Sequence, residues 1–469
     1  MEHRPDLHLR DRARNGIQDT QMRQAIQKAV DRLSSNKAKA TQELGNWDVW
    51  REQGKRIRKH TIENLDYYLA QLAENVRKNG GFVHFVPTAE EARQIVLDIC
   101  KKHNAKMVIK SKSMVSEEIH LNPALEHAGI EAIETDLAEY ILQLAGEAPS
   151  HIIVPAIHKN RHQIAELFGK VAGHPVESDT PSLTAFARKI LRNKFLTADV
   201  GITGCNFAVA QTGSVTLVTN EGNARLTTSL PKVLISIMGM ERIVPTFEDL
   251  EVLLTLLPRS ATGQKLTSYV SVINKTRNVD EKDGAKEFHL LILDNGRSRM
   301  LEDDEFRQAL HCIRCGACFN VCPVYRQIGG HAYASVYGGP IGSVITPLLL
   351  NDLDFWGELA FASSLCAACS SSCPVKIPLH DLLLALRHRR AEAGYTPFLE
   401  KTAFNLWRRF FKLPAAYKFA MKMAAIGQKP FVTNGFIKAG PPPLSNWTNS
   451  RYFPALPGKT FRDRWREKQ

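Results

Sequence analysis

Apolar residues recur at helical spacing in the first part of the chain. They do so over residues 20–80, in MRQAIQKAVDRL and again in TIENLDYYLAQLAENVRK, with charged residues on the opposite face. The second stretch is followed by Asn79-Gly80-Gly81, a sequence typical of a helix C-terminus. The pattern predicts an N-terminal helical segment, residues 1–69, and one more helix at the start of the next domain.

From Phe82 the pattern changes to short apolar runs that alternate with helical stretches. The runs include GFVHFV, KMVIKSK, IEAIET and HIIVPAI, and stretches such as EEARQIVLDICKKHN, LAEYILQLA and RHQIAELFG lie among them. β-Branched residues punctuated by glycine follow as far as VLISIMGMERIVP, which indicates strands joined by tight turns. This alternation predicts an α/β domain over residues 70–298, built on a mainly parallel sheet with helices on its faces.

The chain changes character again at LEDDEFRQAL. Residues 299–395 combine helical stretches and loops around a group of cysteines, and residues 396–469 are punctuated by proline with too little periodicity for a compact core. The net charge of +13 belongs entirely to residues 382–469, which hold 17 Lys+Arg and 4 Asp+Glu. This basic region suits an acidic partner, an anionic membrane surface or nucleic acid, and equally a solubilising surface without a partner.

No apolar run reaches the roughly 18 residues that a membrane-spanning helix needs. The first residues, MEHRPDLHLRDRAR, mix acids and bases without the apolar core of a signal peptide. We therefore expect a cytoplasmic protein whose membrane contact, if it has any, is peripheral.

Seven of the nine cysteines form two motifs, which carry the strongest chemical signal. They read Cys312-x2-Cys315-x2-Cys318-x3-Cys322-Pro323 and Cys366-x2-Cys369-x3-Cys373-Pro374. A chain that wraps a cubane iron-sulfur cluster presents a thiolate at every third residue, and a last Cys followed by Pro extends away to the other cluster. The spacing predicts two 4Fe-4S clusters, with cluster 1 on Cys312, Cys315, Cys318 and Cys373, and cluster 2 on Cys322, Cys366 and Cys369.

Other uses of these cysteines fit the spacing less well. Structural zinc does not explain a third Cys or the Cys-Pro pairs, and disulfides are disfavoured in a reducing compartment. Cys100 and Cys205 stand apart from both motifs and are expected to be packing residues.

The second motif has Ser363 where a first cysteine would stand, so cluster 2 has three cysteine ligands. Two interpretations stay open. Ser363, water or another side chain completes the fourth iron and the cluster only carries electrons, or the iron is open and binds substrate or is easily lost.

Beyond the cysteines, the chain resembles the bacterial lactate utilization protein B family over nearly its whole length. The resemblance rests on CIRCGACFNVCPVY, YGGPIGSVITP, ASSLCAACSSSCPVKIP and AQTGSVTLVTNEGNARLTTSLPKV. It implies that the α/β part is a LUD domain, related in fold to sugar-phosphate isomerases and coenzyme A transferases. It also implies that the cysteine-rich part is an all-helical ferredoxin module with two clusters, like those of succinate dehydrogenase and glycolate oxidase iron-sulfur subunits.

The family's role implies an electron-transfer subunit in the oxidation of L-lactate to pyruvate. Its implied partners are a CCG-motif cysteine-rich protein and a second LUD-domain protein. No GxGxxG fingerprint for a flavin or nicotinamide follows a strand, so chemistry on lactate needs a partner or another cofactor. The competing hypotheses are a subunit of another 2-hydroxyacid oxidase, for example one for glycolate, and a non-catalytic iron-sulfur sensor or nucleic-acid-binding protein.

The α/β domain also offers candidates for binding a small anion. They follow predicted strands, where open α/β sheets place their ligands, and the foremost is Arg225, because a guanidinium can clamp a carboxylate with two hydrogen bonds. The others are Gly213-Ser214, Glu221, Lys110, Lys112, His158, Lys159 and Arg161. Each is equally compatible with a structural role.

Overall fold

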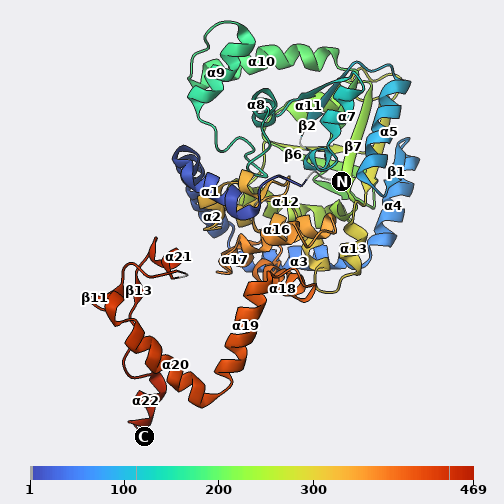
Figure 1. The fold of residues 1–469 in the computed structure, drawn as a ribbon. Coiled ribbons are helices and arrows are strands. Elements are labelled where there is room, and N and C mark those ends of the chain that lie inside the picture. Colours follow the sequence, from blue (N-terminus) through green and yellow to red (C-terminus); the bar gives the residue numbers. More distant parts are fainter. Residues whose placement is uncertain (1–3, 112, 443, 469) are drawn as a thin grey trace. The chain divides into compact units, whose positions relative to one another are not determined.

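The computed structural model describes residues 4–111, 113–442 and 444–468 (Figure 1). The chain divides into two compact units, Met1–Ala393 and Gly394–Gln469, and each is described by itself.

Four helices open the first unit, in the region where the sequence predicts them: α1 (Leu9–Gln18), α2 (Thr20–Leu44), α3 (Trp47–Glu63) and α4 (Leu65–Lys78). Helix α2 begins after Asp19, whose carboxylate accepts a hydrogen bond from the amide of Met22. The guanidinium of Arg58 in α3 is buried and donates to the carbonyl oxygens of Ile243 and His311. These bonds tie α3 to both of the parts that follow it in sequence.

A six-stranded sheet forms the centre of the α/β domain. Its strand order is β1-β10-β7-β4-β2-β3 and every neighbouring pair is parallel. The strands are β1 (Phe82–Val86), β2 (Met107–Ser111), β3 (Glu131–Glu134), β4 (Val200–Thr203), β7 (Val233–Gly239) and β10 (Glu287–Leu293). Both β4 and β7 are buried along their whole length, which matches their continuous apolar sequences. The predicted parallel α/β architecture is confirmed.

Helices and a second sheet complete this domain (Figure 1). The helices are α5 (Ala89–Lys102), α6 (Met114–Glu118), α7 (Leu121–His127), α8 (Leu137–Ala145), α9 (Arg161–Ala172), α10 (Thr180–Thr197), α11 (Asn223–Ser229), η1 (Met240–Arg242) and α12 (Phe247–Ala261). The second sheet, in the order β8-β5-β6-β9, consists of β5 (Phe207–Val209), β6 (Ser214–Thr219), β8 (Ile243–Val244) and β9 (Tyr269–Ile273).

The prediction that HIIVPAI is a strand is wrong, because residues 151–158 form bends and turns. The ring of His151 is buried, and its Nδ1 accepts the amide hydrogens of Ile153 (3.0 Å) and Val154 (3.2 Å). These bonds fold the backbone back on itself, so Pro155 and Ile157 are buried and the other apolar residues half-buried without strand pairing.

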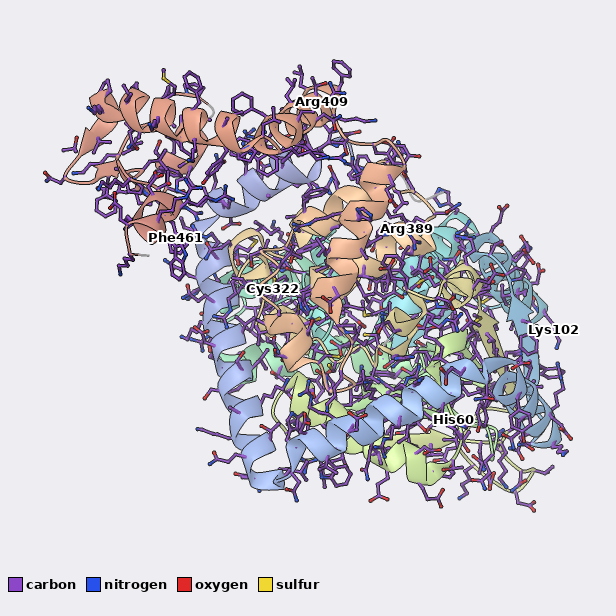
Figure 2. All side chains as sticks on the ribbon, turned by 90° about the horizontal axis from the view of Figure 1, so that it is seen from below. His60, Lys102, Cys322, Arg389, Arg409 and Phe461 are labelled. Carbon is purple, nitrogen blue, oxygen red and sulfur yellow. The ribbon has the colours of Figure 1, made fainter. Side chains whose placement is uncertain are left out.

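The cysteine-rich part of the first unit consists of helices, short 3-10 turns and loops. Its elements are α13 (Arg297–Glu302), η2 (Arg307–His311), α14 (Ala317–Asn320), α15 (Tyr325–Ile328), η3 (His331–Tyr333), α16 (Gly339–Leu349), η4 (Trp356–Phe361), α17 (Ala368–Ser372) and α18 (Leu379–Glu392). One hydrophobic core runs from the N-terminal helices through the α/β domain into this part. Figure 2 labels Cys322, a buried residue of this part, and Lys102 on the α/β domain.

The second unit contains more regular structure than its proline-rich sequence predicts. It holds α19 (Phe398–Phe411), α20 (Pro414–Gly427), η5 (Lys429–Phe431), α21 (Ser445–Thr448), α22 (Phe461–Arg466) and a small antiparallel sheet of β11 (Val432–Thr433), β12 (Phe436–Ile437) and β13 (Phe453–Pro454). Pro397 and Pro414 stand at helix N-termini, where proline is favourable, rather than inside the helices. Neither α19 nor α20 buries a residue, so this unit has only a minor core.

Candidate iron-sulfur site

Four cysteines from both motifs surround one cavity. Cys312 and Cys315 lie in the loop between η2 and α14, Cys318 lies in α14, and Cys373 directly follows α17. Apart from Arg314, the remaining lining is apolar, and it includes Ile152 of the α/β domain. A closed set of four thiols in apolar surroundings fits a cubane cluster, which takes one thiolate on each iron. We call these four residues the first cysteine group.

The other three motif cysteines form a second cysteine group, Cys322, Cys366 and Cys369. Burial raises the pKa of the Cys369 thiol to about 11, and the neighbouring thiols of Cys322 and Cys366 contribute to the rise. Cys322 and Cys369 are buried, whereas Cys366 is exposed. The second group therefore differs from the first in having three thiols, one of which faces solvent.

The two cysteine loops have the same backbone conformation. In the first loop Arg314 (φ 58°) and Gly316 (φ 71°) are left-handed, and the corresponding residues of the second loop, Leu365 (φ 54°) and Ala367 (φ 62°), are left-handed too. Left-handed backbone is rare for residues other than glycine, so its recurrence at matched positions is specific.

Ser363 stands in the second loop where Cys312 stands in the first. The amide of Arg314 donates to Sγ of Cys312 (3.3 Å), and the amide of Leu365 donates to Oγ of Ser363 (3.1 Å). The hydroxyl oxygen of Ser363 thus holds the same position in the second loop as the sulfur of Cys312 holds in the first.

Cationic side chains gather around the first cysteine group. Arg51 Nε donates to the carbonyl oxygen of Cys373 (2.9 Å) and Arg242 Nη1 to that of Cys312 (3.1 Å). Lys37 Nζ donates to the carbonyl oxygen of Ser372 (2.6 Å). These charges offset the negative charge of a cluster bound by four thiolates.

Buried charges also hold the first group against the α/β domain. Glu241 accepts hydrogen bonds from Arg297 Nε (2.6 Å) and Arg314 Nη2 (3.3 Å). Burial alone would raise the pKa of Glu241, but Arg297, Arg314 and Arg242 outweigh it and lower the pKa to about 2. Glu241 is therefore an anion at neutral pH.

Tyr333 is a residue that sequence reasoning missed. It is fully buried, and its hydroxyl has no hydrogen-bond partner among the described residues. Burial raises the pKa of Tyr333, and the nearby thiols of Cys322, Cys318 and Cys369 raise it further. The phenol is thus close enough to thiols of both cysteine groups to interact with them, and a sulfur acceptor of a bound cluster would satisfy its hydrogen.

Cys100 and Cys205 lie outside both groups. Burial raises the pKa of each of these thiols to about 12, so both stay protonated at neutral pH. Neither lines the cavity of the first cysteine group.

The anion-binding candidates of the α/β domain that lie among the described residues do not form one site. Arg225 lies in α11 and its guanidinium stacks on the ring of Tyr269 (5.2 Å). Lys110 is the penultimate residue of β2, and its buried ammonium already binds Glu134 (2.6 Å) and Asn122 (2.6 Å).

Of the remaining candidates that the structure describes, two lie together. His158 and Lys159 both contact Glu147 in another cavity. Gly213-Ser214 lies at the turn that starts β6, Glu221 follows the end of β6, and Arg161 is exposed at the start of α9. Lys112 lies outside the described residues.

A different pair of arginines faces a cavity of about 380 Å³ at the carboxyl ends of the parallel strands. Arg242 and Arg314 line it together with Gly204, which follows β4, and Asp136, which follows β3. Arg314 Nη1 is buried and has no hydrogen-bond partner among the described residues. Guanidinium groups can bind a carboxylate, but the same lining also carries the acidic side chains of Asp136, Glu139, Glu221 and Glu241, which oppose a bound anion. Sequence reasoning missed this pair because only the fold brings η1 next to the first cysteine loop.

This architecture, a parallel α/β domain joined to a module with two cysteine groups, defines a LUD-domain iron-sulfur protein. The LUD domain family matches residues 69–293, the 4Fe-4S dicluster domain matches residues 308–377, and the family "Lactate utilisation protein B, C-terminal" matches residues 387–469. The chain is 54% identical over 460 residues to Lactate utilization protein B of Bacillus thuringiensis (strain Al Hakam), which covers 97% of this chain and 96% of that protein. Relatives of the same name from Bacillus cereus (strain AH187) and Bacillus anthracis (strain A0248) match equally well.

The chain belongs to the lactate utilization protein B family, as its sequence motifs predict. A crystal structure of a DUF162 family protein from Deinococcus radiodurans covers 49% of this chain and 98% of that chain, at 14% identity and a TM-score of 0.29. Among the residues that the structure describes, no helix is long and apolar enough to cross a membrane.

Proposed function

We propose that this protein carries electrons in the oxidation of L-lactate to pyruvate, through two 4Fe-4S clusters. Cys312, Cys315, Cys318 and Cys373 hold cluster 1, and Cys322, Cys366 and Cys369 hold cluster 2. The observation that carries the proposal is the grouping of the seven motif cysteines into two separate sets, each drawn from both motifs. Membership of the lactate utilization protein B family supports lactate as the source of the electrons.

The fourth position of cluster 2 belongs to Ser363 in this proposal. Its support is the matched loop geometry: Ser363 Oγ accepts a hydrogen bond from the amide of Leu365, as Cys312 Sγ accepts one from the amide of Arg314 in the first loop. A hydroxyl is a harder and weaker ligand for this iron than a thiolate, so this corner is the weakest point of the two clusters.

Each bound cluster supplies a one-electron redox centre, so two of them together take the two electrons that lactate releases. The chain's own residues set the conditions for this transfer. Ile152 and its apolar neighbours exclude water from the first cysteine group, while Lys37, Arg51 and Arg242 balance its negative charge. Because Cys366 is exposed, electrons enter or leave the protein through the second cysteine group.

Partner proteins of the lactate utilization system complete the reaction in this proposal. They are a CCG-motif cysteine-rich protein and a second LUD-domain protein. The basic second unit offers them a docking surface, because α19 carries exposed aromatic side chains such as Trp407 (58% exposed) next to arginines.

The test is reduction of the clusters by substrate. The chain is purified anaerobically with both partner proteins and mixed with L-lactate or with glycolate, and the reduced clusters are counted by electron paramagnetic resonance. We expect L-lactate to reduce the clusters only when the partners are present. Reduction by dithionite but not by L-lactate would reject the proposed role, and reduction by glycolate alone would reassign the substrate.

A further inference from the structure

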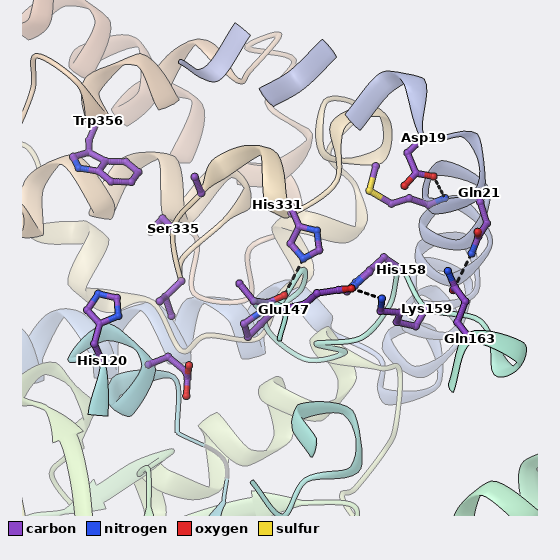
Figure 3. A pocket seen from close by; sticks show the side chains of 17 residues that line it. Asp19, Gln21, His120, Glu147, His158, Lys159, Gln163, His331, Ser335 and Trp356 are labelled. Carbon is purple, nitrogen blue, oxygen red and sulfur yellow. Dashed lines mark hydrogen bonds and ion pairs between the residues drawn. The ribbon is translucent and has the colours of Figure 1, made fainter. Parts of the chain in front are cut away.

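A cavity of about 690 Å³ lies between the α/β domain and the cysteine-rich part of the first unit, apart from both cysteine groups (Figure 3). Four charged side chains line it, of which three are acidic: Asp19, Glu117 and Glu147, with Lys159 as the cation. The wall of this cavity therefore favours a positively charged ligand.

Three metal-ligating side chains meet on one wall of the cavity. Glu147 follows α8, His158 lies in the turn before α9, and His331 begins η3. One ligand atom from each lies within 4.8 Å of the other two. Figure 3 shows these side chains gathered beside Lys159, with His120 and Trp356 elsewhere on the cavity wall.

We propose that Glu147, His158 and His331 bind a divalent transition-metal ion, with zinc or ferrous iron as the best-suited ions. Two imidazoles and one carboxylate are a common ligand set for these metals, and three protein ligands leave positions open toward the cavity. This site is independent of the two clusters and of the electron-transfer role.

The distances suit such an ion. Two ligand atoms that bind one zinc at about 2.1 Å lie about 3 to 3.5 Å apart. Glu147 Oε2 and His158 Nε2 are 2.8 Å apart, and the two imidazole rings have their centroids 4.5 Å apart. All three ligand atoms lie within 4.8 Å of one another, so a movement of the exposed His331 ring closes the third side.

Hydrogen bonds to the atoms that do not face the proposed metal already orient the ligand side chains. His331 Nε2 lies 2.8 Å from the carbonyl oxygen of Ala148, which leaves Nδ1 as its ligand atom. A metal-binding histidine usually donates its other ring nitrogen to a carbonyl or carboxylate in this way. Lys159 holds the other carboxylate oxygen of Glu147, Oε1, and so leaves Oε2 for the metal.

The nearby His151 shows how a purely structural histidine differs. Its Nδ1 accepts two amide hydrogens and its Nε2 bonds Asn320 (3.2 Å), so both nitrogens are used. His158, by contrast, has a buried Nδ1 without a hydrogen-bond partner among the described residues, and its Nε2 contacts only Glu147 there. Neither His158 nor His331 is fully committed to structural hydrogen bonds.

Equilibrium dialysis against zinc tests this site. The protein is loaded with both clusters under anaerobic conditions, and bound zinc is counted by elemental analysis together with iron and sulfide. We expect one tightly bound zinc per chain with the iron and sulfide content unchanged. We expect His331→Ala and Glu147→Gln each to weaken zinc binding at least about 10-fold.

His127→Ala is the matched control, because His127 is also exposed and its Nδ1 also contacts a backbone carbonyl, that of Pro123. It should bind zinc as the unaltered protein does. Absence of a tight zinc, or equal zinc binding by His331→Ala and His127→Ala, would overturn the proposal. Since His331 is exposed, its replacement should leave the clusters intact, and their iron content checks this in the same sample.

Discussion

The two cysteine groups share a backbone conformation but differ in their surroundings. Both loops place left-handed residues at matched positions, Arg314 and Gly316 in the first and Leu365 and Ala367 in the second. The first group has four thiols packed beneath the α/β domain, with Lys37, Arg51 and Arg242 bonded to neighbouring carbonyl groups. The second group has three thiols, and one of them, Cys366, reaches the surface.

This difference indicates a division of roles between two similar loops. Short-range sequence sets the loop shape, while residues distant in sequence set the charge and solvent exposure around it. A buried, cation-lined cluster is protected, and an exposed cluster with a weak ligand exchanges more readily with its environment. The predictions below test this contrast, from the largest expected effect to the smallest.

Removing a thiol should have the largest effect. We expect Cys373→Ala to disrupt cluster 1, although Cys373 belongs to the second motif, and Cys322→Ala to disrupt cluster 2. Each variant should lose about half of the iron and sulfide of the unaltered protein. Spectroscopic identification of the surviving cluster checks the assignment, and Cys100→Ala serves as the control. Loss of the cluster nearest in sequence in both variants would refute the crossed assignment.

Breaking the buried ion pairs beside the first cysteine group should have the next largest effect. In Glu241→Gln the charges of Arg297 and Arg314 lose a buried carboxylate partner. Breaking such a pair costs about 3 kcal/mol, and the melting temperature should fall accordingly. The spectrum of cluster 1 should change while that of cluster 2 stays constant. Arg225→Gln, which alters a guanidinium stacked on Tyr269, is the control.

Controlled oxidation should separate the clusters by their fourth ligand. Mild oxidant should convert cluster 2 to a 3Fe-4S form, because the serine corner holds its iron weakly, and should spare cluster 1. Ser363→Cys should resist this conversion, whereas Ser364→Cys should not. Electron paramagnetic resonance detects the 3Fe-4S form, and equal oxidation of both clusters would show that Ser363 is not the weak point.

A smaller effect is expected from the phenol of Tyr333. We expect the Tyr333 hydroxyl to donate a hydrogen bond to a cluster sulfur. Tyr333→Phe removes this hydroxyl. A hydrogen bond of about 1 kcal/mol corresponds to about 40 mV in a one-electron potential. We therefore expect the potential of one cluster to fall by about 40 mV in a redox titration. Tyr325→Phe is the comparison, since its hydroxyl already donates to the carbonyl oxygen of Ser150 (2.9 Å). Unchanged potentials in Tyr333→Phe would exclude a bond to sulfur.

The smallest effect on the clusters should come from removing the second unit. A chain that ends at Ala393 should keep all of its iron and sulfide, because both cysteine groups lie in the first unit. Electron transfer to the partners should slow, and in the complete chain it should weaken with added salt. Loss of iron from the truncated chain would show that the second unit also supports the clusters.

How much of the fold and of the candidate site the sequence predicts depends on how far apart in the sequence the contacting residues lie. The cysteine motifs and the parallel sheet rest on local patterns, and the structure has the predicted sheet. The strand prediction for HIIVPAI failed because the His151 ring turns the backbone in a way that apolar content does not reveal. Tyr333, Arg242 and Glu147 stand alone in the sequence, and only the fold brings them beside thiols or histidines.

The central claim is that the chain holds two redox clusters of unequal environment. An anaerobic redox titration of the intact protein, followed by electron paramagnetic resonance and by iron and sulfide analysis, tests it most directly. We predict two distinguishable 4Fe-4S centres that take up two electrons per chain in separate one-electron steps. A single centre, or tightly bound metal without acid-labile sulfide, would contradict the account.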